Sequence, residues 1–388
     1  MKVVTGLESF VKGRGAAYKK ARLGLLANQA SVGPGYRHAL DLLDETFPGA
    51  VVALFGPQHG WCGEKQDNMV ESDHGRDRRG RPIFSLYGET RRPTAEMLAG
   101  LEALLVDLVD VGTRVYTFAH TMSHCLEEAA QAGLEVIVLD RPNPIGGAAV
   151  EGNLLADDCR SFVGLHPIPM RHGLSLGELA RFINARLERP ARLSVIPVEN
   201  WRREMYSPET GLPWVYPSPN LPSPDCAWVY PGQVLWEGTN ISEGRGSTRP
   251  FNLVGAPFID PLALLDCLRP LDLPGVIFRP AHFQPTFHKW AGQMCRGLEL
   301  FPVAKSFKPY LTSLAILAAI LKLWPEEFKL KDPPYEYEHS RRPIDLILGR
   351  TDLFDRLAAG SCPVALAESW RDDLAEYEAR RQACLMYD

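Results

Sequence analysis

Residues 134–144 read LEVIVLDRPNP, an apolar run that ends in polar and turn-forming residues. Three runs of the same kind come earlier: RLGLLAN at 22–28, AVVALFGP at 50–57 and ALLVDLVDVG at 103–112. Apolar residues recur at helical spacing over roughly 119–132, and a second helical stretch, HALDLLDETF, precedes the run at 50–57. Apolar strands joined by helices form a parallel sheet that is covered on both faces. The sequence therefore predicts an α/β fold.

The rest of the chain predicts a different mixture of elements. From 166 to 187 a loop runs into a helix, where Ser175 and Glu178 have the spacing of a capping box. The stretch 200–231 is dense in Pro, Trp and Tyr, so we expect an ordered crossing between lobes without regular helix. After it we expect an αβ region over 262–301 and helices over 311–323 and 363–384.

Length, charge and cysteine usage exclude several classes of protein. A chain of 388 residues is too long for one ordinary core, which favours two domains. The net charge of −5 argues against nucleic acid or an anionic membrane as the main partner. The N-terminal segment MKVVTGLESFVKGRG lacks the apolar run of a signal peptide, and the longest apolar stretch, 314–323, is about half of a membrane span. Because the eight cysteines have no metal-binding spacing, we expect reduced thiols and a cytoplasmic protein.

Polar side chains gather where the predicted strands end. These are Gln58 and His59, then Asp107, Asp110 and Arg114, and finally Asp140, Arg141 and Asn143. Ligands of parallel sheets bind at the carboxyl ends of the strands, so these residues are candidates for a binding site. No GxGxxG follows the first strand and no Walker A sequence occurs, so we expect neither a dinucleotide nor a nucleoside triphosphate.

The most unusual segment is the loop 237–249, which reads EGTNISEGRGSTR between two apolar stretches. It carries Glu237, Asn240, Glu243 and Arg245 among glycines that allow a ligand to approach the backbone. Two carboxylates in one loop suit acid–base chemistry. They also suit structural ion pairs with the arginines, and the sequence leaves both interpretations open.

Four histidines are candidates for proton transfer, ligand binding or metal binding. Gly56, Pro57 and Gly60 mark a sharp turn that exposes His59, which favours a role in proton transfer or hydrogen bonding to a ligand. His172 precedes the predicted capping box. His120 and His124 lie four residues apart on a predicted helix, but the intervening TMS lacks the glutamate of HExxH, so structural histidines are favoured over metal ligands.

The blocks of this sequence, in their order, resemble the family first catalogued as domain of unknown function 1343, which is associated with exo-β-N-acetylmuramidases of peptidoglycan recycling. The matching blocks cover nearly the whole chain. They include PQHGWCG (57–63), DLVDVGTRVYT (107–117), LDRPNPIGG (139–147), SFVGLHPIPMRHGLSLGELA (161–180), GLPWVYPSPNLP (211–222), YPGQVLWEGTNISEGRGSTRPF (230–251) and FRPAHFQPTFHKWAG (278–292).

The resemblance implies a Rossmann-like parallel-sheet domain over 1–225 and a smaller α+β domain over 226–388, with the active site between them. The family's reaction is removal of a terminal N-acetylmuramic acid residue from a β-1,4-linked amino-sugar chain, without a metal or organic cofactor. Glu237 or Glu243 would then be one catalytic carboxylate, with Asp110 or Glu71 as the second. The substrate would be oriented by the following side chains: Gln58, His59, Arg114, Arg141, Asn143, His172, Asn240 and Arg245.

One position departs from the family pattern. Relatives usually have a glutamate before the histidine of the first block, whereas this chain has Gln58. An amide cannot donate a proton as a general acid. The next acidic position of the pattern falls at Met69, and Glu64, Asp67 and Glu71 are the nearby substitutes. The alternatives are an enzyme with a relocated acid, an enzyme with a changed substrate, and a non-catalytic sugar-binding relative.

Overall fold

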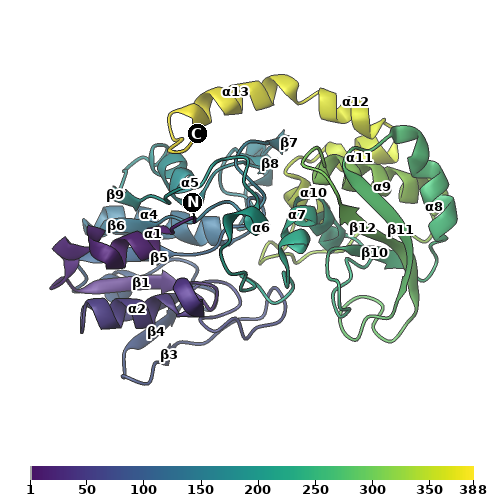
Figure 1. The fold of residues 1–388 in the computed structure, drawn as a ribbon. Coiled ribbons are helices and arrows are strands. Elements are labelled where there is room, and N and C mark those ends of the chain that lie inside the picture. Colours follow the sequence, from purple (N-terminus) through teal and green to yellow (C-terminus); the bar gives the residue numbers. More distant parts are fainter. Residues whose placement is uncertain (1) are drawn as a thin grey trace.

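Within residues 2–388, which the computed structural model describes, seven strands form the larger sheet in the order β3-β4-β2-β1-β5-β6-β9 (Figure 1). All neighbours are parallel except β3, which is antiparallel to β4. The strand order reverses between β1 and β5, as in a Rossmann-like sheet. The four predicted strands are confirmed as β1, β2, β5 and β6. The strands are β1 (Leu23–Ala27), β2 (Val51–Gly56), β3 (Gly75–Arg76), β4 (Pro82–Ser85), β5 (Ala103–Asp107), β6 (Glu135–Leu139) and β9 (Arg192–Ile196).

Both faces of this sheet are buried, as the continuous apolar runs predict. Along β5, Ala103 and Leu105 belong to the core on one face, and Leu104 and Val106 belong to the core on the other. The predicted capping box of α5 is confirmed, because the Ser175 side chain accepts from the backbone N–H of Glu178. The helices of this lobe are α1 (Gly6–Ser9), α2 (Ala39–Thr46), α3 (Ala95–Leu98), α4 (Phe118–Ala132), α5 (Leu176–Asn184) and α6 (Ser207–Thr210), and a two-stranded ribbon is formed by β7 (Glu151–Leu154) and β8 (Pro169–Arg171).

The second lobe is an antiparallel sheet packed with helices (Figure 1). Its strands lie in the order β10-β12-β11, and the apolar α9 crosses the lobe as a buried core helix. Among the described residues, no helix is both long enough and apolar enough to cross a membrane. The strands are β10 (Leu253–Ala256), β11 (Val276–Phe283) and β12 (Cys295–Pro302), and the helices are α7 (Pro224–Gln233), α8 (Pro261–Leu268), α9 (Pro309–Leu323), α10 (Pro343–Leu348), α11 (Leu353–Ala358), α12 (Pro363–Glu368) and α13 (Arg371–Gln382).

Two sequence predictions about helices are wrong. The stretch 200–231 is not free of helix, because α7 begins at Pro224 and contains Pro231. Proline is well tolerated in the first turn of a helix, where Pro224 lies, and Pro231 removes only one backbone donor from α7. The helix expected over 363–384 is divided into α12 and α13, with a break around Trp370.

The two lobes are joined by buried contacts as well as by the chain. The Arg114 guanidinium donates to the carbonyl oxygens of Asn153 and Ile168 in the first lobe and of Ile347 and Leu348 at the end of α10. Helix α13 then returns to the first lobe (Figure 1), where the Tyr377 hydroxyl donates to a backbone carbonyl of the β8–α5 loop. These contacts fix the walls of the cavity between the lobes.

Candidate active site

A cavity lies between the two lobes, beyond the carboxyl ends of β2 and β5. Polar and aromatic groups from both lobes line it: Gln58, His59, Asn68, Tyr116, Thr117 and Ser218 from the first, and Tyr230, Glu237, Arg245, Phe251, Tyr335 and Glu336 from the second.

The turn after β2 places Gln58 in this cavity. His59 and Gly60 both have positive φ (73° and 88°), so the chain reverses sharply and Gln58 stays buried, with 5% of its surface exposed. Its Oε1 accepts from the Thr117 hydroxyl, and its Nε2 donates to the Tyr87 hydroxyl (3.1 Å) and to Glu336 Oε1 (3.0 Å). All polar atoms of the amide are therefore engaged, and Gln58 can orient neighbouring groups but cannot transfer a proton.

His59 presents an unprotonated ring nitrogen to the cavity. Its Nδ1 lies 2.8 Å from the carbonyl oxygen of Lys65, and because a carbonyl only accepts, Nδ1 carries the proton and Nε2 has a free lone pair. Burial lowers the pKa of His59 to about 4. The ring is therefore neutral near pH 7 and can accept a hydrogen bond from a substrate hydroxyl.

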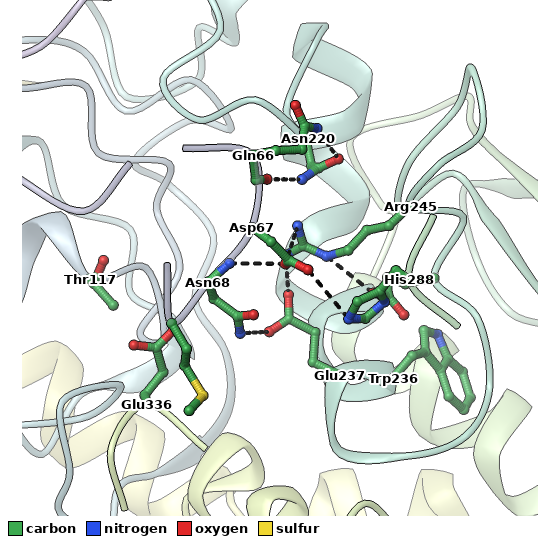
Figure 2. A network of polar contacts seen from close by, with 12 residues as sticks. Gln66, Asp67, Asn68, Thr117, Asn220, Trp236, Glu237, Arg245, His288 and Glu336 are labelled. Carbon is green, nitrogen blue, oxygen red and sulfur yellow. Dashed lines mark hydrogen bonds and ion pairs between the residues drawn. The ribbon is translucent and has the colours of Figure 1, made fainter. Parts of the chain in front are cut away.

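Glu237 is a buried carboxylate held by three donors, of which Arg245 and Asn68 are drawn in Figure 2. Its Oε1 accepts from Arg245 Nη2 at 2.5 Å, and its Oε2 accepts from the Tyr335 hydroxyl at 2.7 Å and from Asn68 Nδ2 at 3.4 Å. The guanidinium, the hydroxyl and the amide thus fix the position of the Glu237 carboxyl at the wall of the cavity.

Glu243 occupies a different position from Glu237, although both lie in the loop 237–249. It is fully buried and does not line the cavity. Its carboxylate lies 2.7 Å from Lys289 Nζ, 3.1 Å from Arg245 Nε and 3.4 Å from His288 Nδ1. Burial alone would raise the pKa of Glu243, but the neighbouring Lys289, Arg245 and His288 lower it to about 2. This arrangement supports the structural interpretation of Glu243, as a brace for Arg245.

Glu336 is a cavity residue that the sequence analysis did not single out. It is 5% exposed and accepts hydrogen bonds from the Tyr87 hydroxyl (2.6 Å) and from Gln58 Nε2 (3.0 Å). Within residues 2–388, no Lys, Arg or His nitrogen lies within 4.0 Å of its carboxyl oxygens. Burial raises the pKa of Glu336 to about 7, although the hydrogen bonds from Tyr87 and Gln58 act in the opposite direction. The site therefore contains two carboxyl groups in contrasting environments.

Asp110 and His172 form a buried pair that does not line the cavity. His172 Nε2 lies 3.0 Å from Asp110 Oδ2, and its Nδ1 accepts from the backbone N–H of Leu174. The role of Asp110 as a second catalytic carboxylate is therefore not supported by the geometry. Glu71 also lies outside the lining, exposed at the surface, where it accepts from the Tyr337 hydroxyl at 3.1 Å.

Four further candidates bind protein groups instead of facing the cavity. Arg114 holds backbone carbonyls of both lobes, and Arg141 forms a two-point ion pair with Asp107 (2.5 and 2.9 Å). Asn143 donates to the Leu174 carbonyl. Asn240 binds the backbone of residues 327 and 329 in the second lobe. Buried polar residues at strand ends satisfy the backbone as often as they serve a ligand, which explains why the sequence pattern overstated the site.

Two of the cavity residues that the sequence analysis missed share one signal. Tyr335 and Glu336 lie in the segment 333–339, which reads PPYEYEH and alternates aromatic and acidic residues. The tyrosine hydroxyls beside these acidic residues are hydrogen-bond donors for carboxyl groups. This alternation is uncommon for an exposed loop. The alternation could have pointed to a buried carboxyl, but it could not show that the segment lies opposite Gln58.

Comparisons with known proteins agree over the whole chain. The family model described as "Exo-beta-N-acetylmuramidase NamZ, N-terminal" matches residues 23–225, and the model described as "Exo-beta-N-acetylmuramidase NamZ, C-terminal" matches residues 228–387. The peptidoglycan β-N-acetylmuramidase NamZ of Bacillus subtilis (strain 168) is 39% identical over 387 residues, which are 100% of this chain and 92% of that protein.

Two crystal structures have the same fold. Both are DUF1343 family proteins from Bacteroides fragilis NCTC 9343, and the alignments cover 100% of this chain and 99% of each of theirs. The first has a TM-score of 0.90 at 31% identity, and the second has a TM-score of 0.78 at 26% identity. The similarity therefore extends across both lobes and the cavity between them.

Proposed function

The chain belongs to the exo-β-N-acetylmuramidase NamZ family, and on this premise we propose that it hydrolyses the glycosidic bond of a terminal β-linked N-acetylmuramic acid residue in peptidoglycan-derived sugar chains. The observation that carries the proposal is the pair of carboxyl groups on the cavity, Glu237 and Glu336. Glycoside hydrolysis commonly uses two carboxyl groups with different protonation states. Glu237 is paired with Arg245, whereas burial raises the pKa of Glu336 to about 7.

The charged lactyl group of the sugar requires a cation, and Arg245 is the cationic residue in the lining of the described cavity. Its guanidinium pairs with Glu237 through Nη2 (2.5 Å), with Glu243 through Nε (3.1 Å) and with Asp67 through Nη1 (3.4 Å). We assign the lactyl carboxylate to Arg245, because the planar fork of arginine suits a carboxylate. His59 Nε2 and Asn68 are placed to bind sugar hydroxyl or acetamido groups.

The direct test uses the purified chain with 4-nitrophenyl β-N-acetylmuraminide, and with the disaccharide in which N-acetylmuramic acid is the non-reducing residue. We expect release of nitrophenol and of free N-acetylmuramic acid, identified by mass. The β-N-acetylglucosaminide, which lacks the lactyl group, serves as the control and should react far more slowly. Arg245→Met should reduce the preference between the two sugars. If neither substrate is cleaved, and Gln58→Glu restores no activity, the proposal fails.

A second candidate function follows from Gln58 itself. An amide stands in the cavity where relatives usually have a glutamate, so the chain can also be a sugar-binding protein without turnover. Calorimetry separates the two functions. Micromolar or tighter binding of a muramic acid disaccharide that is recovered intact would support the binding protein.

A further inference from the structure

We propose that Glu336 is the general acid of this site and protonates the oxygen of the departing sugar, with Gln58 and Tyr87 positioning its carboxyl group. The assignment rests on the proposed glycosidase function. It replaces Asp110, Glu71 and Glu243, which do not line the cavity, with a carboxyl group that does.

The hydrogen bonds of Glu336 leave room for a proton. A carboxylate has about four acceptor sites, and the protein supplies donors for two of them, from Tyr87 to Oε2 and from Gln58 to Oε1. The remaining lone pairs belong to a group that lines the cavity. A proton on one of them leaves both protein hydrogen bonds in place. The same hydrogen-bond geometry is thus compatible with the protonated acid before proton transfer and with the carboxylate after it.

The charges around Glu336 also favour the protonated form. Glu237 is a nearby carboxylate that disfavours a second negative charge, whereas Arg91 is the neighbouring cation that favours it. Arg91 lies with its guanidinium carbon 3.5 Å from the centre of the Tyr337 ring and forms no ion pair with Glu336. Burial and Glu237 prevail over Arg91 and the two hydrogen bonds, and the pKa of Glu336 lies at about 7. An acid that titrates near neutral pH is well matched to proton donation.

The backbone at Glu336 is strained in a manner typical of functional sites. Glu336 and Tyr337 both have positive φ (46° and 67°), and Tyr335 and Glu338 exchange two backbone hydrogen bonds of 2.9 Å. Such a two-residue turn normally carries Asn-Gly, because side chains disfavour this region by on the order of 1 kcal/mol per residue. The turn directs Tyr335 to Glu237 and Glu336 to Gln58. We infer that the strain is retained because these two side chains are needed at the cavity.

The proton transfer balances without a further reactant. The proton of Glu336 moves to the glycosidic oxygen as the C1–O bond breaks, and the electron pair of that bond stays on the oxygen, so the second sugar leaves as an alcohol. Positive charge develops at C1 of the N-acetylmuramic acid residue, inside the cavity that Glu237 lines. Water then adds to C1 and returns its proton to Glu336, which restores the acid. The sum is one water consumed and two hydroxyl groups formed.

Leaving groups of different acidity test this assignment. A nitrophenolate leaves without protonation, whereas a sugar alcohol requires it. In Glu336→Gln we expect kcat/KM on the disaccharide to fall by about 10²–10⁴-fold, the usual contribution of general acid catalysis, while the nitrophenyl glycoside loses less than about tenfold. Glu89→Gln removes an exposed carboxyl two residues from Tyr87 and should change neither rate. Thermal melting of each variant shows that it is folded.

The outcomes distinguish a failure of the acid assignment from a failure of the proposed function. If the wild-type chain cleaves neither substrate and Gln58→Glu restores no activity, the proposed function is overturned. If it cleaves both and Glu336→Gln slows both equally or slows neither, the function stands and the acid assignment is overturned. A second variant, Tyr87→Phe, tests Glu336 without removing it. It deletes the hydroxyl that donates to the ionised carboxyl of Glu336. The alkaline limb of the kcat/KM profile should therefore move to higher pH, and an unmoved limb would contradict the assignment.

Discussion

Replacement of Glu243 by glutamine should destabilise the protein by about 3 kcal/mol. The magnitude follows from the lowering of the Glu243 pKa from 4.5 to about 2, since each unit corresponds to about 1.4 kcal/mol of preferential stabilisation of the carboxylate. The value agrees with the roughly 3–5 kcal/mol lost when one partner of a buried ion pair is removed. In Glu243→Gln, the buried Lys289 keeps two carbonyl contacts, to Trp236 and Ile241, but loses its counterion.

Urea unfolding at pH 7 measures this loss directly, and a shift of the melting temperature by roughly 4 °C should accompany it, from an unfolding entropy of about 2.1 cal/mol/K per residue. Because folding lowers the pKa of Glu243, its stabilisation is present above about pH 4.5 and is lost as the pH falls toward 2. The difference between wild type and variant should therefore shrink on acidification. Glu45→Gln is the control, because the ion pair of Glu45 with Arg37 is half exposed and should contribute less than about 1 kcal/mol. A Glu243→Gln variant within 1 kcal/mol of wild type, with strongly reduced turnover, would refute the structural role of Glu243.

Three other variants probe the lobe interface and the cavity. Arg114→Met removes a donor from four buried carbonyl oxygens, of which that of Leu348 still accepts from Asn153 Nδ2, so we expect a loss of about 3 kcal/mol in urea unfolding. Folding raises the pKa of Glu336 to about 7, so protonation of Glu336 stabilises the fold below about pH 4.5. This stabilisation is lost as the pH rises through 7. The stability of wild type relative to Glu336→Gln should therefore fall by about 3 kcal/mol between pH 4.5 and pH 7. His59→Gln should remove the acid limb of the kcat/KM profile near pH 4, because protonation of Nε2 ends its role as an acceptor; a limb that persists would exclude His59 as its source.

The sequence contains most of the information for the first lobe. The runs at 22–28, 50–57, 103–112 and 134–144 are apolar on both faces, and a parallel sheet covered by helices buries such runs fully. The helix that contains Pro231 was not predictable from composition, because the cost of a proline depends on how near it lies to a helix end.

The active site was predictable only in part. Glu237, His59 and Arg245 were found from glycine-rich turns beside apolar strands, and the structure brings all three to the cavity. Asp110 and Arg114 have the same sequence signature but bind internal partners. Glu336 is 278 residues from Gln58, and a contact of that separation leaves no local pattern in the chain.

Gln58→Glu should convert Glu336 into one half of a carboxyl pair. The Gln58 amide nitrogen is 3.0 Å from Glu336 Oε1, so a glutamate at position 58 would place two carboxyl oxygens where a donor and an acceptor now meet. Two carboxyl groups at that distance share one proton, and the pair loses its second proton at a higher pH than an isolated group. The Thr117 hydroxyl would still donate to the residue at position 58 and the Tyr87 hydroxyl to Glu336, so each carboxyl group keeps a donor while the two share the proton. The alkaline limb of kcat/KM should therefore move upward in Gln58→Glu, and it should vanish in the double variant with Glu336→Gln. A Gln58→Glu profile identical to that of wild type would show that the two side chains do not interact during turnover, and the positioning role of Gln58 would then be wrong.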